Sequence, residues 1–269
     1  MKLILMIFLT LSSITQYAPP VIAQTKKPAT TKKPPSTKKP GSVPKKPPRG
    51  LTPVPGRRRG MSRRDNCPAV KIPLTAIAPF QEQQKVRKQT NKSTIGVVGG
   101  RTTLERPLFL FYLPYTQDLA GSSAEFSLQD SQGTDVFRQK TALPAKSGVV
   151  SVSLPNTVKS LEVGQNYRWY FKVRCSSQTG RPPIYVNGYI QRINLDPRII
   201  QELNTAADNQ QKSKIYAKEG IWFDALNMLA QLRQSSQNTS VEKDWQTLLE
   251  SVELNNIATA PLVNSPLNK

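Results

Sequence analysis

The chain has 269 residues, with 38 Lys and Arg against 17 Asp and Glu, a formal net charge of +21, and no histidine. The missing histidine excludes histidine-dependent acid–base catalysis and metal sites with histidine ligands. The charge is uneven, since residues 1–101 hold 21 of the basic residues and only 2 of the acidic ones. A nearly neutral body therefore carries a strongly basic N-terminal region.

Residues 1–23 have the composition of a secretory signal peptide. Lys2 precedes an apolar run from Leu3 to Leu11, and small residues follow before Gln24. The run is shorter than the roughly 20 apolar residues of a membrane-spanning helix. We therefore expect an exported protein of the periplasm, cell envelope or extracellular space, without a transmembrane segment in the mature chain. An uncleaved N-terminal anchor is the alternative.

Residues 24–66 form a lysine- and proline-rich arm in which Thr-Lys-Lys-Pro occurs three times. This composition cannot bury a core, so we expect disorder with a polyproline II bias. The arm either adheres to an anionic envelope polymer or membrane surface, or is a passive tether. It lacks the aromatic residues that stack on bases, so we predict no specific nucleic-acid binding. The candidate polymer contacts are Lys26, Lys27, Lys32, Lys33, Lys38, Lys39, Lys45, Lys46, Arg57, Arg58 and Arg59.

Residues 67–195 contain short runs of β-forming residues separated by turn signals, with no helical pattern between them. They predict a β-sandwich of about seven strands, of the immunoglobulin or fibronectin type III kind. Leu161, Gly164 and Tyr167 resemble the tyrosine corner of such domains. The polar, then glycine-rich stretch 81–101 is expected to be a mobile loop. The predicted strands are 70–78, 108–113, 124–129, 135–141, 149–154, 167–175 and 184–193.

The two cysteines, Cys67 and Cys175, form an even pair. In an oxidising compartment such a pair suggests a disulfide. Two buried free thiols or one reactive thiol are the competing interpretations. In the strand 167–175 the residues alternate, with Tyr167, Trp169 and Cys175 among those expected to face the core.

The outward residues of the strands 167–175 and 184–193 combine tyrosines, amides and basic groups, which suit sugar or peptide recognition. The alternative is that the C-terminal helices cover this face. The apolar strand 108–113 makes the opposite sheet an equally good docking site for them. The residues of this possible ligand face are Arg168, Tyr170, Lys172, Tyr185, Asn187, Tyr189 and Gln191.

After Asn194 the apolar period becomes helical, and residues 196–257 predict a small helical region packed on the sandwich, with a frayed tail over 258–269. Asp196 and Asp208 are candidate N-caps, and Gly220 is a candidate C′ residue. Thr239 to Glu242 matches a capping box. The pattern Tyr216…Gly220-x-Trp-x-x-Ala…Leu229 resembles one tetratricopeptide helix pair, followed by one or two further helices.

The body as a whole resembles a cyanobacterial secreted family catalogued as domain of unknown function 928. The resemblance is carried by 74–76, 105–115, 167–171, 188–192 and 216–226. It implies a secreted envelope protein, and it brings no activity and no catalytic residues.

We predict an exported, non-enzymatic binding or scaffold protein of the cell envelope, without a cofactor. Its partner would be an anionic envelope polymer or another envelope protein. No Ser-His-Asp set, metal-ligand spacing or phosphate loop occurs in the sequence. The alternative is a hydrolase or transferase that acts on envelope material through carboxylates, for which Glu125 and Asp130 are a candidate pair.

Overall fold

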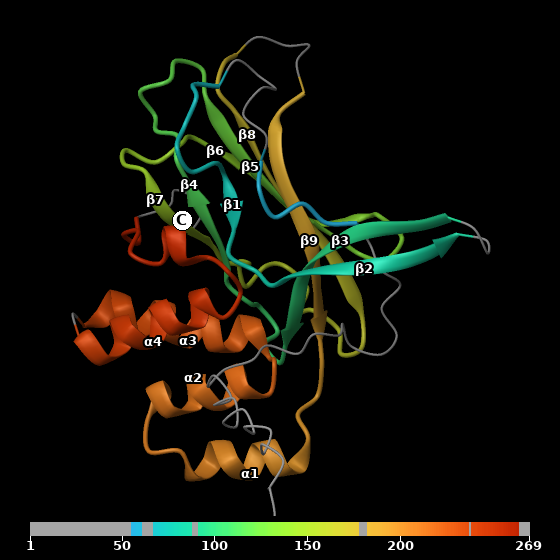
Figure 1. Ribbon diagram of the computed structural model, residues 1–269, viewed down its shortest axis with the longest axis vertical. Helices are drawn as coiled ribbons and strands as arrows, with labels where there is room; N and C mark the ends of the chain where they lie inside the picture. The colour runs from blue at the N-terminus through green and yellow to red at the C-terminus, as the bar shows by residue number, and fades with distance from the viewer. Residues whose placement is uncertain (1–54, 61–66, 88–90, 178–181, 237, 264–269) are drawn as a thin grey trace, which may run out of the picture. The chain divides into compact units, whose positions relative to one another are not determined.

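The computed structural model describes residues 55–60, 67–87, 91–177, 182–236 and 238–263, which form two β-sheets followed by helices (Figure 1). The signal-peptide segment and most of the predicted arm lie outside these residues. A three-stranded sheet has the order β1-β4-β7, and a six-stranded sheet has the order β2-β3-β9-β8-β5-β6. A mainly β body with a helical C-terminal region is therefore confirmed, and the immunoglobulin-like classification stays a prediction.

The strands of the three-stranded sheet are Thr75–Ala76 (β1), Phe109–Leu113 (β4) and Gly148–Val152 (β7). Those of the six-stranded sheet are Phe80–Arg87 (β2), Asn91–Thr102 (β3), Ser123–Gln129 (β5), Asp135–Thr141 (β6), Asn166–Arg174 (β8) and Ile184–Arg192 (β9). The helices are Pro197–Thr205 (α1), Asn209–Lys218 (α2), Trp222–Ser235 (α3) and Thr239–Glu250 (α4), with a 3₁₀ turn at Asn255–Ile257.

Aromatic side chains from both sheets pack together in the core. The rings of Phe111 in β4 and Phe171 in β8 stack with centroids 4.3 Å apart, and Phe109 lies 4.9 Å from Phe126 of β5. Aromatic pairs of this kind add to the gain from burying their area. The alternation predicted for the strand at 167–175 is confirmed, because every second residue of β8 is buried.

The tyrosine-corner contact is present at the start of β8. The Tyr167 hydroxyl oxygen accepts a hydrogen bond of 2.9 Å from the backbone N–H of Glu162. The bond ties the incoming loop to the first buried residue of the strand, as the local sequence pattern predicted.

The prediction of a mobile loop at 81–101 is wrong. This stretch forms most of the β2–β3 hairpin, and the end of β3 pairs in parallel with β9. Its polar and glycine-rich composition disfavours a strand by propensity alone. At position 99 the structure requires glycine. The φ of Gly99 is +137°, and a Cβ there would lie 2.1 Å from the carbonyl oxygen of Tyr189.

Residues 55–60, which we call the strap, belong to the folded body. Arg57 pairs with Asn187 of β9 through two backbone hydrogen bonds of 2.9 and 3.0 Å. One residue further on, the carbonyl of Arg58 accepts a 2.8 Å bond from the N–H of Ala76 in β1. The strap therefore connects the six-stranded sheet to the three-stranded one, and the prediction that the basic arm extends to residue 66 is wrong at 55–60.

The helix termini follow the predicted signals, with one shift. The side chains of Asp196 and Asp208 cap α1 and α2, and Gly220 has a φ of +68° after α2. The cap of α4 is Asn238, whose side chain accepts from the N–H of Ser240, so the predicted cap was one residue late.

Helices α3 and α4 join the same core as the sheets, which confirms that the helical region packs against the β body. The buried residues of α1, Ile199 and Leu203, form a separate small cluster with Ile221. The ring of Phe223 in α3 meets Phe109 of β4 edge-on, with centroids 5.7 Å apart. The indole N–H of Trp222 donates to the carbonyl of Ile77, at 3.2 Å. These contacts place α3 against β4 and against the residue that follows β1, and α3 also packs on β3. Figure 1 shows the helices stacked below the sheets.

A buried carboxylate holds the N-terminus of α3 to the end of β3. Asp224 is 2% exposed and accepts hydrogen bonds from the Thr102 hydroxyl at 2.7 Å and from the backbone N–H and hydroxyl of Thr103. Burial raises the pKa of Asp224, and the hydrogen bonds oppose that shift. Sequence patterning did not single out this residue, because an acidic residue in the first turn of a helix is ordinary.

The C-terminal segment is ordered further than we expected. The N–H of Val149 in β7 donates to the carbonyl of Pro261, and the N–H of Val263 donates to the carbonyl of Val149. The prediction of a frayed tail from residue 258 is therefore wrong up to Val263. None of the helices in the described part of the chain has both the length and the apolar composition that crossing a membrane requires.

Candidate functional site: a cationic groove

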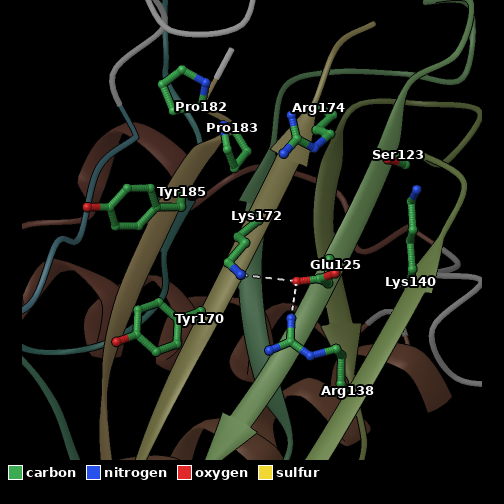
Figure 2. Close-up of a pocket in the computed structure, with 10 residues that line it drawn as sticks. All are labelled: Ser123, Glu125, Arg138, Lys140, Tyr170, Lys172, Arg174, Pro182, Pro183 and Tyr185. Atoms are coloured by element: carbon green, nitrogen blue, oxygen red, sulfur yellow. Dashed lines mark hydrogen bonds and ion pairs between the residues drawn. The ribbon is translucent and has the colours of Figure 1, made fainter. Parts of the chain in front are cut away.

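A groove of about 540 Å³ lies on the outer face of the six-stranded sheet, over β5, β6, β8 and β9 (Figure 2). Its wall combines basic, aromatic and small side chains with a single carboxylate. The lining residues are Ser123, Glu125, Arg138, Lys140, Tyr170, Lys172, Arg174, Pro182, Pro183 and Tyr185.

Strand register places four of these residues in one row across the sheet. Lys140 of β6 is opposite Glu125 of β5, which is opposite Lys172 of β8, which is opposite Tyr185 of β9. Directly paired residues in a sheet point to the same face. The row therefore crosses four strands, and Figure 2 shows its side chains along the groove.

Glu125 is held by two cations. Its Oε1 accepts from Lys172 Nζ at 3.1 Å and from Arg138 Nη1 at 2.5 Å. Arg138 also donates through Nε to Asp135, at 2.7 Å, and this hydrogen bond raises the pKa of Arg138 and lowers that of Asp135. Both partners of Glu125 keep solvent contact, with side-chain exposures of 40% for Arg138 and 32% for Lys172.

The groove retains an excess of positive charge after these pairings. Arg138, Lys140, Lys172 and Arg174 line it together with one carboxylate, that of Glu125. Within the described part of the chain, no hydrogen bond or ion pair engages the exposed ammonium group of Lys140. A concave surface with this balance favours an anionic ligand.

Two tyrosines supply the aromatic surface of the groove. Lys172 Nζ lies 5.9 Å from the ring centroid of Tyr170, and the guanidinium of Arg57 lies 4.7 Å over the ring of Tyr185. Arg57 belongs to the strap, so the chain that precedes residue 55 joins the body beside the Tyr185 end of the groove. Pro182 and Pro183 extend the apolar part of this wall.

The predicted ligand face is divided by the tertiary structure. Tyr170, Lys172 and Tyr185 line the groove, whereas Arg168 is half-buried and donates to the Tyr170 hydroxyl at 3.2 Å. The remaining members, Asn187, Tyr189 and Gln191, are at most 8% exposed.

The strap, β3 and a loop account for this burial. The Asn187 side chain donates to the carbonyl of Pro55 at 3.1 Å, and that of Gln191 donates to the carbonyl of Gly164 at 3.3 Å. Tyr189 lies against the backbone of Gly99, and burial raises its pKa to about 12. The helices make none of these contacts.

The predicted polymer contacts in the arm separate into two groups. Lys26, Lys27, Lys32, Lys33, Lys38, Lys39, Lys45 and Lys46 lie outside the described residues. In the strap, Arg57 stacks on Tyr185 and Arg59 is exposed. Arg58 instead donates to the carbonyl of Val252 at 2.6 Å, and burial lowers its pKa, so it is a structural contact of the body.

The two cysteines are joined in a disulfide, with Cα atoms 5.1 Å apart. Cys175 directly follows Arg174, so the bond anchors the segment from Cys67 to the end of β8 beside the groove. The predicted disulfide is therefore confirmed, and the two alternatives, a pair of buried free thiols or one reactive thiol, are wrong.

The carboxylates named as a candidate catalytic pair have separate surroundings. Asp130 accepts hydrogen bonds from the N–H groups of Gln132 and Thr134 and closes the β5–β6 turn. Glu125 lies in the groove between its two cations. In the described ranges, no cluster of acidic or cysteine side chains has the arrangement of a metal site.

Sequence patterning did not single out Ser123, Arg138 or Lys140, and it assigned Arg174 only to the outward face of the strand 167–175. Each lies on a strand whose alternation could assign it to a face, but only the pairing register shows that they share one groove.

A family model described as Domain of Unknown Function (DUF928) matches residues 56–262, from the strap to the C-terminal segment beside β7. No curated protein matches the chain. The match covers more than half of the chain and agrees with the motifs recognised in its sequence. The protein therefore belongs to the DUF928 family.

Proposed function

We propose that this protein is an exported, non-enzymatic binding or scaffold protein of the cell envelope, and that it associates with an anionic polymer. The observation that supports this most is the groove, in which four basic side chains face one carboxylate. A ligand with several negative charges would replace water around these cations and gain charge-assisted hydrogen bonds.

The basic arm would act together with the groove. Its sequence contains repeated lysine pairs and no acidic residue between Gln24 and Pro55. The strap fixes residues 55–60 next to Tyr185, so a long polyanion bound in the groove would lie beside the point where the arm joins the folded body. Two weak contacts with one polymer can give a much higher combined affinity than either alone.

The compartment is part of the same proposal. The disulfide between Cys67 and Cys175 is compatible with an oxidising compartment, and residues 1–23 have the pattern of a signal peptide. A cyanobacterial source is an expectation from the sequence resemblance, and an immunoglobulin-like class is an interpretation supported by the Tyr167 corner contact.

A sedimentation assay with isolated peptidoglycan and with an acidic polysaccharide tests the proposal. The full mature chain should bind, and its affinity should fall steeply between 50 and 300 mM salt because exposed charges are screened beyond about 10 Å at 0.1 M. A chain that starts at residue 55 should bind more weakly, and Lys140→Gln should weaken the remaining binding. Lys243→Gln removes an exposed charge from α4, away from the groove, and should leave binding unchanged.

Absence of binding at low salt, or equal binding to a neutral polysaccharide, would contradict the proposal. Turnover of the polymer, measured as new reducing ends and abolished by Glu125→Gln, would favour the hydrolase or transferase alternative.

A further inference from the structure

We propose that the ligand of the groove is a carboxylated polysaccharide of the uronate type, lying across the four strands with one sugar ring on Tyr185. This inference rests on the proposed function and names the class of polymer. It is argued from the order of side chains along the row from Lys140 to Tyr185.

The row is long enough for more than one ligand unit. Adjacent strands lie about 4.8 Å apart, so the backbone positions of Lys140 and Tyr185 are separated by roughly 14 Å across β6, β5, β8 and β9. Positive groups occur along this path, with Lys140 at one end, Lys172 in the middle and Arg57 at the other end, and Arg174 lies two residues further along β8 from Lys172. An extended polymer with repeated negative charges fits this order better than a single small anion.

The position of Glu125 favours a ligand that also donates hydrogen bonds. Its carboxylate lies between Lys172 and Arg138 and would repel an uninterrupted series of phosphates. It can accept from a sugar hydroxyl, and Ser123 can accept from or donate to another. A uronate polymer carries both carboxylates and hydroxyl donors, whereas a polyphosphate carries only anionic and acceptor oxygens.

The groove offers little to a peptide backbone. It lies on the face of the sheet, and β5 and β8 are each paired with a strand on both sides. An extended peptide binds well where a sheet edge offers unpaired backbone groups. Over β5 and β8 the groove therefore lacks the main-chain contacts that an acidic peptide would use, and the unpaired strand edge beside it is that of β6, at the Lys140 end.

The tyrosine end of the groove suits a sugar ring. Tyr185 is half-buried, and the guanidinium of Arg57 covers one face of its ring at 4.7 Å from the centroid, so a sugar ring would stack on the opposite face. A rigid aromatic ring can cover the apolar face of a sugar while nearby polar groups bind its substituents. Pro182 and Pro183 continue this apolar surface along the wall.

Isothermal titration of the mature disulfide-bonded protein with four probes of similar length tests this inference. The probes are an oligogalacturonate, a neutral cello-oligosaccharide, an oligoglutamate and an inorganic polyphosphate. We expect the oligogalacturonate to bind at least roughly tenfold more tightly than any of the others, the difference of about one charge-assisted hydrogen bond or one stacking contact.

The variants separate the parts of the groove. Lys140→Gln should weaken oligogalacturonate binding roughly tenfold, and Tyr185→Ala should do the same, whereas Tyr185→Phe keeps the ring and should stay within about twofold. Lys243→Gln is the matched charge control. Thermal unfolding of each variant, followed by circular dichroism, checks that the fold is intact.

The outcomes distinguish this inference from the proposed function. If oligoglutamate or polyphosphate binds as tightly as oligogalacturonate and Lys140→Gln weakens both, the groove binds polyanions but the uronate assignment is overturned. If Tyr185→Ala leaves oligogalacturonate binding unchanged, the stacking geometry is overturned. If no anionic probe binds while long acidic polysaccharide still sediments with the arm, the groove has no part in binding and the inference fails.

Discussion

Reduction of the disulfide between Cys67 and Cys175 should lower the stability of the folded body by a measurable amount. The bond closes a loop with a sequence separation of 108 residues. In the chain-entropy treatment, a loop of this length removes about 16 cal/mol/K from the unfolded state, or about 4.8 kcal/mol at 25 °C. Residual structure in the unfolded chain reduces this value, so we expect a loss of about 2–5 kcal/mol.

Scanning calorimetry of the oxidised and the reductant-treated wild type measures this effect. For a folded body of about 200 residues, each kcal/mol corresponds to roughly 2–4 °C, so the midpoint should fall by roughly 4–20 °C. The double variant Cys67→Ala/Cys175→Ala is the control for the reductant itself, because its midpoint should not respond to reduction. Reduced wild type keeps both sulfur atoms, so it separates the loss of the bond from the loss of buried volume at Cys175.

The reasoning would be refuted if complete reduction, verified by mass after alkylation, shifted the midpoint by less than about 2 °C. Such a result would mean that residual structure in the reduced unfolded chain already restrains the segment from Cys67, so that the bond removes little further entropy. It would also mean that the disulfide is not a main contributor to the stability of the body.

Three further predictions concern the contacts that join the parts of the body. Asp224→Ala should cost about 2–4 kcal/mol in urea unfolding, because it removes the acceptor of the Thr102 hydroxyl and of the Thr103 hydroxyl and N–H; a loss below about 0.5 kcal/mol would contradict this. Gly99→Ala should lower the free energy of unfolding by about 2–5 kcal/mol, because the new Cβ would lie 2.1 Å from a carbonyl oxygen of β9. Gly133→Ala is the control: it is also at positive φ, but nothing lies within 4 Å of its Cβ, so it should cost only about 1 kcal/mol. A chain starting at residue 55 should have a thermal midpoint within about 1 °C of that of the longer chain. A chain starting at residue 61 should be less stable by roughly 2–6 kcal/mol, because it lacks the hydrogen bonds of the strap to both sheets. Equal midpoints for these two truncated chains would show that the strap does not stabilise the body.

Much of the local structure could be predicted from the sequence, because the relevant signals act over a few residues. The alternation from Tyr167 to Cys175 predicted which side chains of β8 are buried. Asp208 and Gly220 marked the beginning and end of α2, through one capping bond and one positive φ. The even cysteine pair similarly favoured the disulfide that the structure contains.

Strand partners far apart in sequence could not be predicted in this way. The stretch 81–101 has weak strand propensity, and it forms β2 and β3 because β9 supplies backbone partners for the end of β3. Arg57 and Arg59 were interpreted as part of a disordered arm because their own segment is basic and short. Only the facing edges of β9 and β1 provide the hydrogen bonds that order the strap.

The groove shows the same division most clearly. The sequence by itself determined a basic arm, a nearly neutral β-rich body, and the alternation that turns Tyr170, Lys172 and Tyr185 outward. It did not determine that Lys140 and Glu125 extend the same row, nor that Tyr189 is buried against β3. Side-chain direction along a strand follows from local backbone geometry, whereas membership of one groove depends on the register between strands that only tertiary pairing sets.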